Sequence, residues 1–167
     1  MDKRKLTDAE IDWLQTIFAD SVDYSSVHIY KVQIPSFLPH NAISFGGNIY
    51  FPADYYCEDF SITSEHFKHW IVHEMTHVWQ SQNGFPVLYA GILLFITGGY
   101  LNKRAYSYKK AILRGKDFSQ LNMEQQASLL SDFFISSKST SDLPLSKSMR
   151  CFVNQRDAAC NLPCFFA

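Results

Sequence analysis

Two histidines and a glutamate in the middle of the chain have the spacing of a catalytic metal site. Residues 73–77 read His-Glu-Met-Thr-His, an H-E-x-x-H pattern. Side chains four positions apart lie on one face of a helix, so both imidazoles can bind one zinc ion at about 2.0–2.1 Å. Glu74, beside the first histidine, can take a proton from a zinc-bound water and later deliver one to a leaving amine. The pattern predicts zinc-dependent (Zn²⁺) hydrolysis of a peptide or amide bond.

A third zinc ligand is needed, because a catalytic zinc usually has three protein ligands and one open position. The positions that would complete the pattern H-E-x-x-H-x-x-G-x-x-H hold Gln80 and Asn83, which excludes that subclass. Glu124 is the sole glutamate after the motif, and we expect it to be the third ligand. Asp132 is the alternative, either as a ligand or as the acceptor that orients a ligand histidine.

Hydrolysis also needs a donor to the oxyanion of the tetrahedral intermediate, besides the metal. Tyr106 and Tyr108 precede Glu124 in the sequence, and His69 lies one turn before His73. We predict the donor among Tyr106, Tyr108 and His69. The alternative for each tyrosine is packing with its hydroxyl exposed, and for His69 it is a surface position near the start of its helix.

The helix that must hold the motif is predicted over residues 63–82. A Thr-Ser-Glu sequence marks its start, and apolar residues around the motif recur at helical spacing. Gly84 is placed to end it as a C-terminal cap. A later helix is predicted over about 122–137, because Asn122 and Gln125 form a capping pattern. This later helix would carry the third ligand.

The remaining elements predict an α+β fold. A capping box begins a helix over about residues 7–20. Residues 27–34 alternate as a strand does, and residues 42–51 indicate a strand, a glycine turn or bulge, and a second strand. We therefore expect a small antiparallel sheet beside the motif helix. An exposed strand edge near residues 47–51 would bind an extended peptide as an additional strand.

Length and composition fit one folded domain. The chain has 167 residues, of which 47% are hydrophobic and 19% charged, and this excludes general disorder. The net charge of -1 gives no argument for binding nucleic acid. We expect one domain over residues 1–148 and a tail over 149–167 that packs on it or is flexible. The sequence assigns no role to the four cysteines: Cys57, Cys151, Cys160 and Cys164.

One apolar stretch stands out, at residues 85–97. Its thirteen residues are too few to cross a bilayer, which takes about 20. We expect a buried helix or a cleft wall that lines side-chain pockets; a membrane contact is the weaker alternative. Residues 103–116 follow with six positive charges and no acid. We expect a solvated face there, and an anionic partner is the alternative.

Three segments resemble zinc metallopeptidase-type domains associated with bacterial contractile injection machines. They are GNIYFPADYYCEDFS, HEMTHVWQSQNG and NMEQQASLLSDFF, within about residues 43–135. Some such domains are fused to the spike protein of type VI secretion systems, and others are small proteins encoded beside spike and Rhs genes. The resemblance implies a compact zincin-like, specifically gluzincin-like, fold. It implies His73, His77 and Glu124 as zinc ligands and Glu74 as the base.

The resemblance also implies a cellular setting. We expect export by the secretion machine, in agreement with an N-terminal sequence that does not read as a secretory signal. The effector or toxin would be cytoplasmic in its producer and act in the periplasm of a target cell on protein or peptidoglycan peptides. A secretion spike protein and an immunity protein are the expected partners.

Two other functions compete with the metallopeptidase. One is a non-enzymatic, metal-stabilised adaptor on the spike, and the other is a membrane-active toxin that uses residues 85–97. Glu74 favours the enzyme, because a structural zinc site has no use for that carboxylate and would use a fourth protein ligand.

Overall fold

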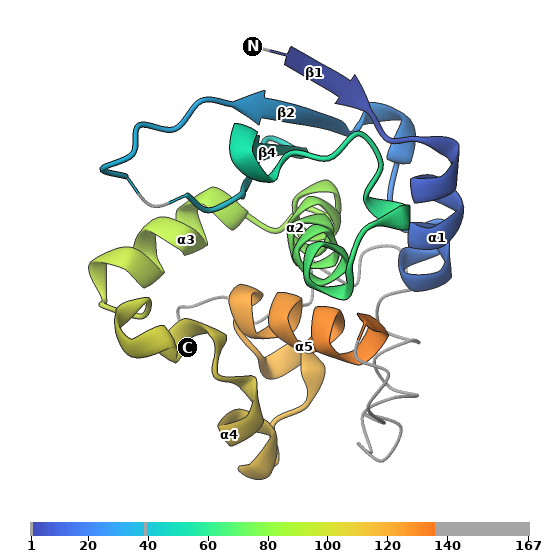
Figure 1. Ribbon diagram of the computed structural model, residues 1–167. Coiled ribbons are helices and arrows are strands. Elements are labelled where there is room, and N and C mark those ends of the chain that lie inside the picture. Colours follow the sequence, from blue (N-terminus) through green and yellow to red (C-terminus); the bar gives the residue numbers. More distant parts are fainter. Residues whose placement is uncertain (1, 39, 136–167) are drawn as a thin grey trace.

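Helix α2 (Glu65–Gln82) lies at the centre of the molecule, between a sheet and a second long helix (Figure 1). The computed structural model describes residues 2–38 and 40–135. The sheet covers one side of α2, and helix α5 (Met123–Ile135) packs against the other. Both helices match predicted ones within a few residues at each end. The α+β class is confirmed, and the motif helix lies in the interior.

The sheet has four strands in the order β1-β2-β4-β3. These are β1 (Asp2–Lys5), β2 (His28–Val32), β3 (Ile43–Phe45) and β4 (Asn48–Pro52). The expected antiparallel sheet is wrong, because β2 and β4 pair in parallel while the two outer pairs are antiparallel. After β2 the chain passes to the far edge, forms β3, and returns beside β2 as β4. The result is a mixed sheet.

The predicted strand-glycine-strand pattern forms the β3–β4 hairpin. Gly46 and Gly47 connect the strands with φ angles of 59° and 76°. A two-residue turn with positive φ at both positions follows the natural twist of a hairpin and favours glycine. Strand β3 is the last strand of the sheet and contacts α2. The exposed strand edge expected near residues 47–51 is therefore wrong, because these residues form β4, which pairs with β2 on one side and β3 on the other.

Helix α1 (Asp8–Phe18) begins at the predicted capping box and is anchored by a buried ion pair. The Thr7 hydroxyl accepts a hydrogen bond from the Glu10 amide at 3.1 Å, and the Glu10 carboxylate accepts from the Thr7 amide at 2.8 Å. Glu10 also receives two bonds from Arg4 of β1, at 2.7 and 2.8 Å, and one from the Phe60 amide. This carboxylate therefore joins β1, α1 and the segment before α2.

The core lies where α1, the sheet, α2 and α5 meet. Its fully buried side chains come from the three helices and from the two inner strands, β2 and β4. They include Leu14, Phe18, Ile29, Ile49, Phe51, Ile71, Met75, Trp79, Leu129 and Leu130.

The apolar stretch forms helix α3 (Val87–Ile96), and it is not a buried helix. Only Ala90 and Leu94 of this helix are buried, because it covers the molecule with one side and faces outward with the other. No helix in the described part of the chain is long and apolar enough to cross a membrane. The 3-10 segment η4 (Leu101–Tyr106) and helix α4 (Tyr108–Leu113) then lead to α5.

Short 3-10 turns make the remaining connections: Tyr24–Ser26, Ala53–Tyr55, Phe60–Ile62 and Phe118–Gln120. Cys57 is a free thiol of intermediate exposure. The predicted boundary at residue 148 and the tail with Cys151, Cys160 and Cys164 lie outside the described residues.

We predict that Glu10→Ala lowers the free energy of unfolding by about 3 kcal/mol or more. It leaves Arg4 without its buried partner, and breaking such a pair is strongly destabilising. Urea denaturation followed by circular dichroism measures the change. Asp12→Ala on the exposed side of the same helix is the matched control, with an expected change within about 0.5 kcal/mol. Equal stability of the two variants would show that the Arg4–Glu10 ion pair does not stabilise the fold.

Candidate metal centre

Helices α2 and α5 bring two imidazoles and one carboxylate together. His73 and His77 lie one turn apart on α2, with ring centroids 4.9 Å apart. Oε2 of Glu124 lies 3.1 Å from Nε2 of His73 and 3.3 Å from Nε2 of His77. One potential ligand atom from each of the three residues lies within 4.8 Å of the others, which is close enough to hold one metal ion. The predicted ligand set is therefore assembled.

The start of α5 fixes the position of Glu124. The Asn122 side chain accepts a hydrogen bond from the Gln125 amide at 2.8 Å, and the Gln125 side chain accepts from the Asn122 amide at 3.2 Å. This reciprocal cap is the pattern predicted from the sequence. It starts the helix at Met123 and places Glu124 in the first turn, facing α2.

Gln80 orients His77 through a buried amide network. The Gln80 Nε2 group donates to the Met123 carbonyl at 3.2 Å and to Oε1 of Gln126 at 2.9 Å. Its Oε1 atom therefore faces Nδ1 of His77, at 2.8 Å, and must accept a hydrogen from it. That tautomer leaves Nε2 of a neutral His77 free to bind metal. The sequence analysis used Gln80 only to show that the glycine of the longer H-E-x-x-H-x-x-G-x-x-H pattern is not present, and it did not predict this contact with His77.

Tyr100 holds the other oxygen of Glu124. Its hydroxyl donates to Oε1 of Glu124 at 2.8 Å, so Oε2 faces the two imidazoles. Burial and the adjacent Glu124 carboxylate raise the pKa of Tyr100, which keeps the phenol a hydrogen-bond donor. Sequence reasoning missed this residue because it lies just after the apolar stretch and belongs to no motif.

The three grouped side chains compensate one another electrostatically. Burial favours the neutral form of Glu124, but His77 and His73 hold the pKa of its carboxyl well below the usual range. Burial would lower the pKa of His77, but the Glu124 carboxylate raises it to about 9. The anionic carboxylate thus attracts positive charge, either a protonated imidazole or a cation between the two helices.

Glu74 lies outside this group and is held by the edge strand. It is only 5% exposed. The Ser44 hydroxyl of β3 is 2.8 Å from Oε2 of Glu74 and 2.9 Å from the Glu74 carbonyl oxygen. Glu74 is therefore next to a grouped histidine in sequence while its carboxylate is directed by the sheet. No local sequence pattern predicts the Ser44 contact, because it joins two separate elements, β3 and α2.

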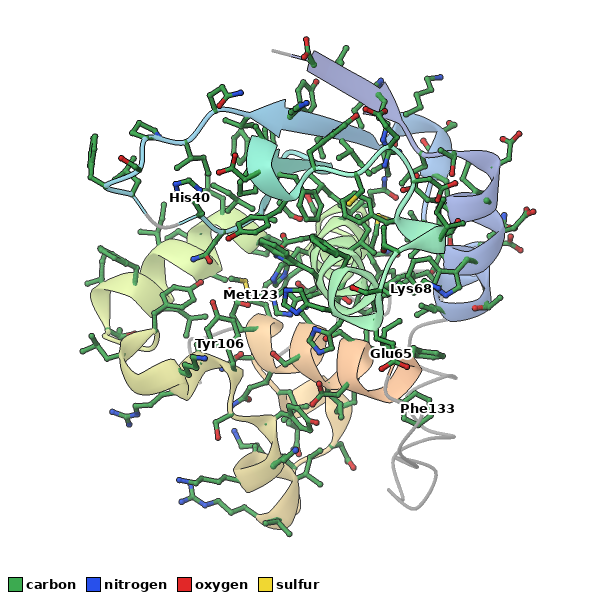
Figure 2. All side chains as sticks on the ribbon, in the orientation of Figure 1. His40, Glu65, Lys68, Tyr106, Met123 and Phe133 are labelled. Atoms are coloured by element: carbon green, nitrogen blue, oxygen red, sulfur yellow. The ribbon has the colours of Figure 1, made fainter. Side chains whose placement is uncertain are left out.

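Of the three residues predicted as oxyanion donors, Tyr106 lies beside His73, whereas Tyr108 and His69 both contact Asp132. The Tyr106 ring lies 6.0 Å from the His73 ring and is partly exposed (Figure 2 shows it near Met123, in the space between α2, α3 and α5). The Tyr108 hydroxyl instead donates to Asp132, whose other carboxylate oxygen is 2.8 Å from Nε2 of His69. Asp132 thus binds His69 and Tyr108, and it is not part of the group formed by the three potential ligands.

A hollow of about 340 Å³ opens beside His77. It is enclosed by the β3–β4 turn, the end of α2 and the start of α3. Its lining comprises Ser44, Phe45, Gly46, Gly47, His77, Ser81 and residues 85–89. The first part of the apolar stretch is therefore a cleft wall, as expected, although the rest of α3 is not. A larger hollow of about 960 Å³, beside α1, includes none of the metal-site residues.

Comparison with known proteins gives a setting for this site. No protein-family model matches the sequence. The chain is 30% identical over 141 residues to the type VI secretion system spike protein VgrG2b of Pseudomonas aeruginosa, across 79% of this chain and 13% of the spike protein. The structure is similar to the solved effector domain of Pseudomonas aeruginosa VgrG2b, with a TM-score of 0.64 and 27% identity. That match covers 87% of this chain and 80% of the solved one.

The chain thus spans about an eighth of the spike protein and most of its solved effector domain. This homology links the chain to type VI secretion spike effectors.

On the hypothesis that this group holds zinc, we predict that Tyr100→Phe weakens zinc affinity about tenfold or more while the fold is kept. The substitution removes only the hydroxyl that orients Glu124, and partners of metal ligands contribute about 10–100-fold to affinity. Competition with a chromogenic chelator measures the change. Tyr89→Phe, on the exposed part of α3, is the control and should bind zinc as the unmodified chain does. Equal affinities of both variants would show that Tyr100 does not position the ligand.

Proposed function

We propose that this chain is a zinc metallopeptidase effector of the type VI secretion class. In this proposal His73, His77 and Glu124 hold the zinc, and Glu74 is the general base. The observation that carries it is the grouping of two imidazoles and one carboxylate, with a second acidic side chain, Glu74, adjacent but outside the group. A catalytic zinc needs this arrangement, because three ligands leave one position open.

The residues present fit a zinc ion. Imidazole and carboxylate ligands suit this metal. Glu124 is 6% exposed and aims one oxygen at both Nε2 atoms, where a cation would neutralise it. Gln80 fixes the tautomer of His77 that presents Nε2. When bound, zinc would lower the pKa of water at the site and polarise the substrate carbonyl.

Glu74 supplies the proton transfers of the proposed reaction. Its carboxylate takes a proton from the attacking water while the water oxygen bonds to the carbonyl carbon. The same proton goes to the amide nitrogen as the C–N bond breaks, which releases an amine and a carboxylic acid. Ser44 holds one carboxylate oxygen of Glu74 throughout and so limits its rotation.

Tyr106 is the proposed donor to the oxyanion. Burial, together with the Glu124 and Glu74 carboxylates, raises its pKa, so the hydroxyl keeps its proton at neutral pH. Its ring lies beside His73 at the exposed side of the site. Because the Tyr108 hydroxyl is bonded to Asp132, we do not assign it this role in the proposed reaction.

The homology supports the proposed setting. We infer delivery by a type VI secretion machine, action in the periplasm of a target cell, and a spike protein and an immunity protein as partners. The substrate would be a protein or a peptidoglycan peptide. The non-enzymatic adaptor is less well supported, because the group found in the described residues has three potential ligands and a structural zinc usually takes four.

We predict that Glu74→Gln keeps zinc and fold but lowers peptide cleavage at least about a hundredfold, since a general base contributes about 10²–10⁴. Zinc content is measured by mass spectrometry, and activity by casein cleavage and by growth of bacteria that express the chain in the periplasm. Glu65→Gln, in the first turn of α2, is the control. Growth inhibition by Glu74→Gln equal to that of the unmodified chain would refute the proposed chemistry.

The ligand assignment is tested by a matched pair of substitutions. Glu124→Gln should abolish stable zinc binding, because a carboxamide is a poor zinc ligand, whereas Asp132→Asn should bind zinc as before. Added zinc should raise the melting temperature of Asp132→Asn and leave that of Glu124→Gln unchanged, because only a ligand that binds the folded state stabilises it. The reverse pattern would assign the third ligand to Asp132.

A further inference from the structure

The outward side of α3 carries five exposed apolar or aromatic side chains. Leu88, Ile92 and Phe95 follow one another at helical spacing, and Tyr89 and Ile96 lie beside them. All five are about half exposed or more, and Phe95 and Ile96 reach 75% and 74%. Leu101, just after the helix, is 69% exposed. Large apolar side chains grouped in this way mark an interaction surface more often than single ones do.

The segments that follow α3 carry strong positive charge. The sequence has no carboxylate side chain between Glu74 and Asp117, although the whole chain has a net charge of -1. The same interval contains six basic residues, all exposed: Lys103, Arg104, Lys109, Lys110, Arg114 and Lys116. Figure 1 shows α3 at the left and α4 at the bottom of the molecule, both away from α1.

We propose that α3, together with the basic residues of η4, α4 and the turn after it, docks on an anionic lipid bilayer. The apolar side chains would enter the boundary between headgroups and acyl chains, and the lysines and arginines would meet the anionic headgroups. The ten residues of α3 span about 15 Å, half of the hydrocarbon thickness of about 30 Å, so the helix lies on the membrane and does not cross it.

The charge pattern favours a lipid surface over a protein partner. Four of the six basic residues are lysines, and lysine is depleted in protein interfaces. Spread over η4, α4 and the turn after it, in a stretch of sequence without any carboxylate, these basic residues complement a diffuse negative surface better than one discrete site. The start of α3 also lines the hollow beside His77, so docking would bring that hollow close to the bilayer.

Vesicle co-sedimentation of the full zinc-loaded chain tests the proposal. We expect binding to vesicles of phosphatidylcholine mixed with phosphatidylglycerol, weak binding to phosphatidylcholine alone, and weaker binding at high salt. The double substitution Phe95→Ser with Ile96→Ser should lower partitioning at least about tenfold, since each buried CH₂ contributes about 0.8 kcal/mol. The double substitution Lys109→Glu with Lys110→Glu should lower binding to the anionic vesicles at least about tenfold.

Matched controls separate this surface from general effects. Ile62→Ser removes an exposed apolar side chain elsewhere, and Lys3→Glu with Lys5→Glu reverses two charges on β1; neither should change partitioning. Glu74→Gln should bind vesicles normally, so that a failure of the proposed chemistry and a failure of the docking surface are distinguishable. Zinc content and near-ultraviolet circular dichroism show whether each variant is folded.

Three outcomes would overturn the proposal. The first is that the unmodified chain does not bind anionic vesicles. The second is that the Phe95/Ile96 variant and the Lys109/Lys110 variant both bind these vesicles as well as the unmodified chain does. The third is a dimer in solution that the Phe95/Ile96 substitutions dissociate, without vesicle binding, which would assign the face to a second copy of the chain. If the Phe95/Ile96 variant does not fold, the Lys109/Lys110 variant and the salt dependence decide.

Discussion

The contact of one buried carboxylate with two imidazoles is the constraint on which the rest of the structure depends. Glu124 lies between α2 and α5, and burying such a charge is costly unless partners compensate it. His73 and His77 compensate it from α2, and Tyr100 binds its other oxygen from the start of η4. The packing of the two helices and the geometry of the candidate metal centre therefore specify each other.

Polar contacts extend this constraint into the interface between the helices. Gln80 joins His77 to Gln126 and to the backbone of α5, and Gln126 donates in turn to the Phe118 carbonyl. A buried network of this kind rigidifies a core when its members are satisfied. The imidazole of His77 is thus positioned by Gln80, which is itself held by α5, and a shift of α5 along α2 would disturb the two bonds from Gln80 to α5.

Sequence patterns predicted the parts of this molecule that depend on local spacing. The motif helix, the cap that places Glu124 and the Gly46-Gly47 turn all follow from residues within a few positions of one another. Strand β1 was not predicted, because its charged sequence Asp2–Lys5 lacks the apolar alternation of a strand, and its pairing with β2 is a contact between distant parts of the chain. The parallel pairing of β2 and β4 depends on the chain path between them, which no local pattern encodes.

The contacts of Ser44, Gln80 and Tyr100 with the site also had no local signal, because each depends on two elements packing together. Hydrophobicity predicted α3 only in part. A buried helix or a cleft wall was expected for residues 85–97; the start of this stretch lines the hollow beside His77, whereas the outward side of α3 is exposed.

The double contact of Ser44 has a mechanical consequence. One hydroxyl of the edge strand lies within hydrogen-bond distance of both the main chain and the carboxylate of Glu74. Because a serine hydroxyl has a single hydrogen, these two acceptors share it. The orientation of the Glu74 carboxylate therefore depends on the position of β3 as well as on α2.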